Sequence, residues 1–395
     1  MNEFQQGIIS LLQSALDGAA ATLPAAFDLQ AACAFGLRQS LLPLLYAGMQ
    51  NSGVSLPETL AAPVETHLLQ NLMADSRQTA ALTALYAAFE QNEIDYMPLK
   101  GAGLKALYPS SDLRPMGDAD ILIRYAQYPK ICPVMQALGY TAERESDHEL
   151  VWSSGSVKIE LHKKLLPRYN QDYYAYYGDG WRLAVPAQPG GFRYTMKPED
   201  ELVYLLTHLA KHYRNGGIGL RHLMDIRVFC AANGNLDFDY IDEQLRRLEL
   251  MPFGENVIRT ANTVFTGGTP DAVGETILDY MFAGGAFGTH EGHTVFAAVN
   301  KSHTVGGMKK TRREIVRLHV FPALNVMEKM YPCLSGRAFL LPVFWVVRAF
   351  DLLFRRRDRI RRQTDEMRMI ADDKVAAYYR EMSAVGLGFN FKETK

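Results

Sequence analysis

Three acidic side chains in the middle of the sequence have the spacing of a metal-binding site. The stretch LRPMGDADILI carries Asp118 and Asp120, two residues apart at the start of an apolar run. Residues two apart on a strand project from the same face. The later run VKIELH alternates between apolar and polar residues, which puts Glu160 on its polar face. If the two strands are neighbours, three carboxylates meet at one place.

Neighbouring carboxylates repel one another unless cations neutralise them. Hard divalent cations such as Mg²⁺ or Mn²⁺ prefer oxygen ligands, and two such ions can hold the attacking and leaving oxygens of a phosphoryl displacement. We therefore interpret Asp118, Asp120 and Glu160 as metal ligands and catalytic residues, and expect Asp120→Asn to melt no lower than the wild type without metal. The structural alternative is that Asp118 caps a turn and Asp120 lies exposed on an edge strand.

A glycine turn precedes these carboxylates. In PLKGAGLKALY, Gly101 stands where a predicted strand turns into a short helix. A glycine there permits close approach of a ligand to the backbone, and the first amides of a helix favour an anion such as a triphosphate. Lys100 adds a positive charge beside the turn. Lys100 and Gly101 are therefore candidate nucleotide-binding residues.

The glycine turn, the Asp-Ala-Asp strand and the later acidic strand together resemble the nucleotidyltransferase superfamily of DNA polymerase β. More narrowly, LKGAGLKALYP, LRPMGDADILI, LGY and IELH resemble a bacterial family of uncharacterised nucleotidyltransferases, closely over residues 94–165. The resemblance implies that Asp118 and Asp120 bind two Mg²⁺ or Mn²⁺ ions. It also implies that Glu160 binds the ion that activates the acceptor hydroxyl, and that Gly101 contacts the phosphates of an NTP substrate.

One position departs from the superfamily pattern. The superfamily usually has Gly-Ser or Gly-Gly at the turn, whereas this chain has Gly101-Ala102 preceded by Lys100. The implied reaction moves a nucleoside monophosphate from an NTP, such as ATP, to a hydroxyl of a small molecule, a sugar, RNA or a protein, and releases pyrophosphate. The alternative is a catalytically degenerate protein of the same fold that binds nucleotides or acts as a membrane-associated accessory protein, which the missing serine motivates.

Two further polar residues flank the carboxylates. Arg114, in the loop before Asp118, is expected either to bind a phosphate or to pair with Asp112. His162 shares the polar face of Glu160, so it either positions the acceptor or serves as a structural hydrogen-bonding residue. We include Arg114 among the candidate nucleotide-binding residues and His162 among the candidate pocket residues.

Downstream, two pairs of residues fall on predicted helices at i, i+4 spacing. His208 and His212 share a helix face. Zinc can use this spacing, but the glutamate of an HExxH motif is absent, so a helix face that lines the nucleotide pocket is the favoured interpretation. Arg221 and Asp225 either form a simple helix ion pair or belong to the same pocket.

The pattern along the chain predicts an α+β fold with a polymerase β-like nucleotidyltransferase core, a small mixed sheet with helices, between two helical regions. Residues 1–92 have helical spacing, including a long helix expected to begin near Pro63. Residues 93–196 hold the short strands of the catalytic core, with a hairpin at HELVWSSGSVKIELH. Helical patterns then dominate residues 197–395.

The composition is that of a globular cytosolic protein. Of 395 residues, 48% are hydrophobic and 22% are charged, and the formal net charge is −1. A net charge this small supplies no global attraction to nucleic acid or membranes. The four cysteines form no CxxC pair, which argues against a zinc cluster or redox motif. The N-terminus is amphipathic and lacks the basic start of a signal peptide.

One C-terminal segment departs from this balance. The apolar run of residues 338–354 precedes six arginines between Arg355 and Arg362. An apolar helix followed by a basic cluster can lie in a membrane interface, and the same cluster can bind RNA or an acidic partner. The alternative is a buried helix that continues into a solvated one, with the arginines paired to nearby acidic residues. We expect a cytoplasmic protein, with peripheral membrane contact as the second hypothesis; the oligomeric state is not predicted.

Overall fold

The structure is a computed structural model, and it describes residues 1–167, 171–286, 327, 331, 338–354 and 372–388. The chain divides into two compact units. The first consists of Met1–Tyr213, Ile218–Phe287 and Ala384–Leu387, and the second of Arg214–Gly217, Gly288–Ser383 and Gly388–Lys395. The candidate site residues all lie in the first unit.

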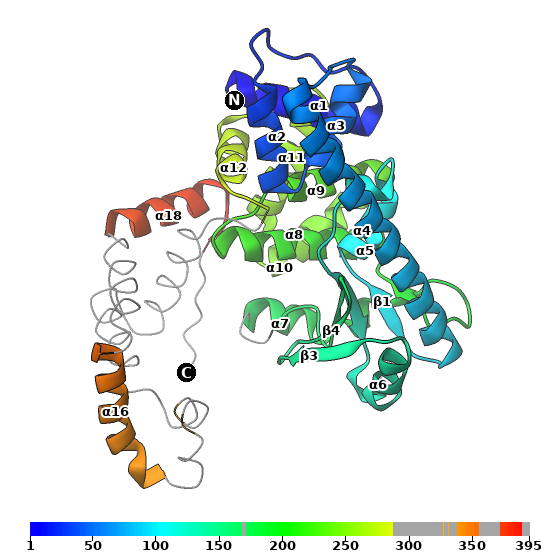
Figure 1. Ribbon diagram of the computed structural model, residues 1–395, viewed down its shortest axis with the longest axis vertical. Helices are drawn as coiled ribbons and strands as arrows, with labels where there is room; N and C mark the ends of the chain where they lie inside the picture. Colours follow the sequence, from blue (N-terminus) through cyan, green and yellow to red (C-terminus); the bar gives the residue numbers. More distant parts are fainter. Residues whose placement is uncertain (168–170, 287–326, 328–330, 332–337, 355–371, 389–395) are drawn as a thin grey trace. The chain divides into compact units, whose positions relative to one another are not determined.

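The first part of this unit is helical, as the sequence predicts (Figure 1). Its helices are α1 (Glu3–Asp17), α2 (Leu29–Gln39), α3 (Leu42–Asn51) and α4 (Glu58–Gln91). The start of α4 differs from the expectation, because the helix begins at Glu58 and Pro63 lies inside it. A proline inside a helix removes one backbone hydrogen bond, and α4 continues through that position.

The strands form a five-stranded mixed sheet in the order β1-β2-β5-β4-β3. They are β1 (Tyr96–Pro98), β2 (Ala119–Ile123), β3 (Thr141–Glu145), β4 (Glu149–Ser154) and β5 (Val157–His162). β2 and β5 are parallel, and the other neighbours are antiparallel. The predicted hairpin is confirmed as β4–β5, with Gly155 at φ +57° in its turn. Every residue of β3 is exposed, so the sequence has no alternating pattern that would reveal this strand.

One face of the sheet carries the hydrophobic core. The ends of α4 and of α6 (Tyr128–Ala137) pack on this face (Figure 1). The buried side chains include Leu85, Phe89, Ile121, Ile131, Met135, Ile159 and Leu161. Because side chains alternate across a strand, the residues between these apolar positions project from the opposite face, where the candidate carboxylates lie.

The remaining elements of the first unit are mainly helical. They are α5 (Gly101–Leu104), α7 (Gln171–Tyr177), the two-stranded sheet β6 (Val185–Pro186) and β7 (Tyr194–Thr195), α8 (Pro198–Arg214), α9 (Arg221–Ala232), α10 (Phe238–Arg247), α11 (Met251–Val264) and α12 (Ala272–Ala283). The small mixed sheet with surrounding helices confirms the predicted α+β class. The division at residues 92 and 196 stays a prediction.

The second unit includes α16 (Leu341–Phe354) and most of α18 (Asp372–Ala384). None of the helices in the described part of the chain is long and apolar enough to cross a bilayer. The basic cluster from Arg355 to Arg362 lies outside the described residues, so its expected membrane, RNA or acidic partner stays a prediction.

Candidate functional site

The two strands that carry the acidic residues are neighbours, as expected. β2 and β5 run parallel, and Asp120 pairs with Glu160 in their register. Ile121 and Ile159 point into the core, so the two carboxylates project from the other face of the sheet. Asp118 lies just before β2, two residues from Asp120. The sheet topology therefore brings Asp120 and Glu160 together, whereas Asp118 lies in the loop before β2 and is not in the group of side chains whose ligand atoms lie within 4.8 Å of one another.

The three carboxylates do not have equal environments. Burial raises the pKa of Asp118, and the negative charges of Asp120 and Glu160 raise it further. Burial also tends to raise the pKa of Asp120, but the Lys100 ammonium, 3.2 Å from Oδ1, lowers it by more. The imidazole of His162 donates to the same oxygen at 2.6 Å. These two groups hold the pKa of Asp120 well below its usual range, so the repulsion in the cluster falls mainly on Asp118.

The turn before α5 combines a positive-φ backbone conformation at Lys100 with close packing at Gly101. Lys100 has φ +45° and ψ −116°, a conformation that costs a non-glycine residue about 1–3 kcal/mol. It places the lysine side chain beside Asp120. A Cβ atom at Gly101 would lie 2.8 Å from both Arg114 Nη1 and Met116 Sδ. A larger residue here would therefore have to displace the side chains of Arg114 and Met116, and a phosphate contact by Gly101 stays a prediction.

Arg114 pairs with Asp225 on α9. Its Nε and Nη2 donate to the two carboxylate oxygens at 2.7 and 2.8 Å, and the Tyr108 hydroxyl donates to Oδ1 at 2.7 Å. Both charged side chains are less than a tenth exposed. The expected pair with Asp112 is wrong, because Asp225 offers a buried bidentate partner, the stronger arrangement. Arg114 thereby holds the loop that leads to the carboxylates.

The expected ion pair between Arg221 and Asp225 on one helix is also wrong, because the Asp225 carboxylate pairs with Arg114 instead. Arg221 Nη1 instead donates to the backbone oxygen of Pro115 at 2.9 Å. Burial and the nearby Arg114 charge lower the pKa of Arg221. Arg114 as a phosphate ligand, and Arg221 and Asp225 as pocket residues, remain predictions.

The two histidines of α8 bond to each other. His208 Nε2 and His212 Nε2 lie 3.1 Å apart. Burial and the positive charge of Lys100 lower the pKa of His208, while burial and Lys211 lower the pKa of His212 to about 2. Both rings are therefore neutral at pH 7, and one donates to the other. Neither belongs to a group of metal-capable side chains in the described part of the chain.

The acidic side of the sheet fits a divalent cation. One ligand atom each from Asp120, Glu160 and His162 lies within 4.8 Å of the others, so a single ion can reach all three. Carboxylate oxygens suit Mg²⁺ or Mn²⁺, and an imidazole suits transition metals. His162 was expected as a pocket residue, and the structure places it among the ligand atoms. A second group, His148, Glu149 and His162, lies beside it.

A comparison with known protein families agrees with this geometry. Residues 25–266, more than half of the chain, match a family described as uncharacterised nucleotidyltransferases. The chain belongs to this nucleotidyltransferase family. The matched region contains the whole five-stranded sheet, the helices α8 to α10 and every candidate site residue. No curated protein and no solved structure matches the chain.

In this member of the family, α4 holds the loop that leads to the carboxylates, a feature the sequence analysis missed. Asn71 donates to the backbone oxygen of Asp112 at 2.7 Å, and Gln78 donates to that of Met116 at 2.6 Å. Between them, Asp75 forms a buried ion pair with Lys105. Polar residues at i, i+4 and i+7 on a helix share one face, which is the sequence signal that was available.

Lys211 on α8 is a second missed residue. Burial and the charge of Lys100 lower its pKa to about 8, while Asp120, Glu149 and Glu160 act in the opposite direction. Lys211 therefore lies within electrostatic reach of the acidic cluster. It is three residues after His208 on the same helix face, so the sequence placed it near the pocket without identifying it.

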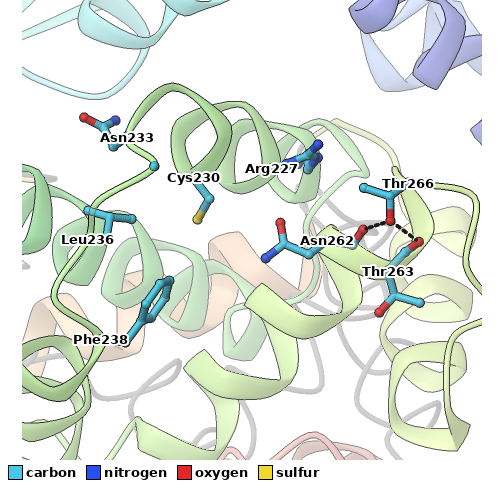
Figure 2. A pocket seen from close by; sticks show the side chains of 9 residues that line it. Arg227, Cys230, Asn233, Leu236, Phe238, Asn262, Thr263 and Thr266 are labelled. Atoms are coloured by element: carbon cyan, nitrogen blue, oxygen red, sulfur yellow. Dashed lines mark hydrogen bonds between the residues drawn. The ribbon is translucent and has the colours of Figure 1, made fainter.

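Two cavities lie away from the carboxylates. One of about 470 Å³ lies between α9 and α11, where Arg227, Cys230 and Asn262 line it (Figure 2). Another of about 590 Å³ lies at the carboxyl ends of β2 and β5, with Arg124 and Lys164 in its wall. Neither is lined by the three carboxylates, so the candidate site is defined by its charged side chains rather than by these cavities.

Proposed function

We propose that the protein is a metal-dependent nucleotidyltransferase that moves a nucleoside monophosphate from an NTP to an acceptor hydroxyl and releases pyrophosphate. The observation that carries the proposal is the parallel register of Asp120 and Glu160, with Asp118 near enough that the negative charges of both raise its pKa. The family membership supports nucleotidyl transfer in general. The acceptor class stays open between a small molecule, a sugar, RNA and a protein.

In this proposal Asp118, Asp120 and Glu160 hold two Mg²⁺ or Mn²⁺ ions. When bound, these ions supply positive charge that neutralises the triphosphate and the developing charge on the reacting oxygens. Asp118 is the carboxylate that would gain most from a cation, because burial and its two acidic neighbours disfavour its charged form. Glu160, on the neighbouring strand, would bind the ion that activates the acceptor hydroxyl.

Lys100 changes partner in this proposal. In the ligand-free protein its ammonium neutralises Asp120 at 3.2 Å. With a cation held by Asp120, Lys100 would no longer be needed to neutralise this carboxylate and could contact a phosphate. This assigns to Lys100 the phosphate contact that a serine after Gly101 makes in the wider superfamily. In-line positioning of the two oxygens then supplies most of the remaining rate acceleration.

A catalytically degenerate protein is the second candidate, and one observation favours it. Asp120 is already satisfied by Lys100 and His162, which a binding protein without metal would need. Retention of Asp118 and Glu160 beside it favours the enzyme, because a binding protein has no use for the repulsion among them.

The decisive assay distinguishes transfer of the α phosphorus of the NTP from transfer of its γ phosphorus. Each of the four NTPs, labelled with ³²P at the α or the γ phosphorus, is incubated with the protein, Mg²⁺ or Mn²⁺, and cell extract. Nucleotidyl transfer moves only the α label to the acceptor. Glu160→Gln should reduce this transfer by about 100-fold or more, because metal-ion stabilisation of a transition state contributes several kcal/mol.

Glu145→Gln is the matched control, since Glu145 is an exposed carboxylate on β3 that pairs with Lys163. It should transfer the α label at the wild-type rate. Transfer of the γ label, or equal α transfer by the Glu160→Gln variant, would count against the proposed reaction. Absence of transfer with all four NTPs, together with NTP binding that does not need metal, would favour the degenerate protein.

A further inference from the structure

Helix α8 carries a lysine, Lys211, on the same face as Tyr204 and His208. Tyr204, His208 and Lys211 follow one another at i, i+4 and i+7 on α8, so they share one helix face. The charge of Lys100 affects the pKa of all three side chains. Since Lys100 is bonded to Asp120, this face of α8 lies against the acidic side of the sheet.

Lys211 makes no ion pair within 4.0 Å in the part of the chain that the structure describes. Other lysines around the sheet do pair: Lys100 with Asp120 at 3.2 Å, Lys158 with Glu160 at 3.1 Å, and Lys164 with Asp147 at 2.8 Å. Lys211 is nevertheless only partly exposed. A buried ammonium without a counter-ion is unfavourable, so its retention here points to an anion that is supplied from outside.

The groups around Lys211 do not supply that anion. The nearest helix neighbours, His208 and His212, are neutral. Asp120, Glu160 and Glu149 already have Lys100, Lys158 and Arg144 as partners. None of these carboxylates therefore lies at ion-pair distance from the Lys211 ammonium.

We propose that Lys211 binds a phosphate oxygen of the NTP from the α8 side, opposite Lys100. The inference rests on the proposed function, since it requires a triphosphate in the site. The two lysines would then hold the polyphosphate between the sheet and α8, and the acidic cluster would hold it through the cations. Lys211 is a substrate-binding residue in this account.

The test measures binding of the α,β-methylene analogues of ATP, GTP, CTP and UTP, and of the matching nucleosides, by titration calorimetry with Mn²⁺. Lys211→Met should weaken the preferred triphosphate analogue by about 10- to 100-fold, because one charge-assisted hydrogen bond is lost. Its affinity for the nucleoside should not change. Lys211→Arg, which keeps the charge, should stay within about threefold of the wild type.

Lys130→Met is the control, because Lys130 is an exposed lysine on α6, and it should bind like the wild type. Circular dichroism melting verifies that each variant is folded. Equal triphosphate affinity of wild type and Lys211→Met would overturn the inference alone, as would an equal loss of nucleoside binding, which marks a structural role. Absence of triphosphate binding by the wild type would overturn the proposed function and the inference with it.

Discussion

Two buried charge clusters lie close together in this protein and differ in how their charges are balanced. In the first, Arg114 donates twice to Asp225, and the Tyr108 hydroxyl completes the set. In the second, Asp118 faces two other carboxylates, and its pKa is raised by burial and by both of them. The first cluster is complete without a ligand, whereas the second is not.

The difference indicates that the Arg114–Asp225 cluster has a structural role and that the carboxylate cluster has a functional one. A buried bidentate ion pair fixes the geometry of the groups it joins, and here it ties α9 to the loop before β2. A like-charge cluster has no such role, and strongly perturbed carboxylates gather at functional sites. The balanced cluster therefore holds the unbalanced one in position.

The largest expected effect is at the balanced cluster. Asp225→Ala should lower the free energy of unfolding by about 3–5 kcal/mol, because it leaves the Arg114 charge buried without a partner. Chemical denaturation at pH 7 measures this loss. Because Arg114 holds the folded pKa of Asp225 below its unfolded value, the contribution of the pair is present at neutral pH and disappears as acidification protonates the carboxyl.

Asp112→Ala is the control for that experiment. Asp112 is the partner that the sequence suggested for Arg114, and in the structure its side chain accepts a hydrogen bond from Ser110. Its removal should change the free energy of unfolding by less than about 1 kcal/mol. Equal losses for Asp112→Ala and Asp225→Ala would contradict the assigned ion pair.

The next effect compares two aspartates of the same motif. Asp120→Asn should destabilise the metal-free protein by about 2 kcal/mol, because Lys100 loses its charged partner. Asp118→Asn should instead stabilise it by about 0.5–1 kcal/mol, because it relieves repulsion from Asp120 and Glu160. The ion pair with Lys100 thus reverses the expectation drawn from sequence for Asp120→Asn.

Melting curves in EDTA measure both variants against the wild type. The melting temperature of Asp120→Asn should lie below that of the wild type, and the melting temperature of Asp118→Asn should lie above it. If both melt below the wild type, Asp118 has a stabilising partner and the cluster is not strained.

A third effect, seen only above neutral pH, is at Glu201 on α8, a partly buried carboxyl whose pKa burial raises to about 7. The folded state then holds a proton that the unfolded state releases between about pH 4.5 and 7, so this group lowers stability as the pH rises through that range. Glu201→Gln should flatten the decline and stabilise the protein at pH 8 by about 1 kcal/mol. Denaturation at pH 5, 6.5 and 8 tests this, and parallel profiles for variant and wild type would contradict it.

The sequence predicted the faces of Asp120 and Glu160 because these depend on strand periodicity. The alternation in β5 determines which face each of its side chains takes. Once β2 and β5 are neighbours, Asp120 and Glu160 meet, and the role of these carboxylates as metal ligands stays a prediction. The hairpin and the class of fold follow from the same short-range patterns.

The opposite side of the site was not predicted, because it is built from distant segments. Arg114 meets Asp225 across 111 residues of sequence, and no local pattern distinguishes that partner from Asp112. Lys211 is one of many lysines on amphipathic helices until α8 is placed against the sheet. The strand β3 was also missed, since an exposed strand has no apolar alternation.

Metal-dependent nucleotide binding tests the central account most directly. The α,β-methylene NTP that binds wild type best is titrated into wild type, Glu160→Gln and the control Glu145→Gln, in Mn²⁺ and in EDTA. The account predicts that Mn²⁺ strengthens binding to wild type and Glu145→Gln by about tenfold or more, because three carboxylates without cations repel a triphosphate. Glu160→Gln should lose most of that gain. Equal affinities in Mn²⁺ and EDTA for the wild type would contradict the assignment of the carboxylates as metal ligands.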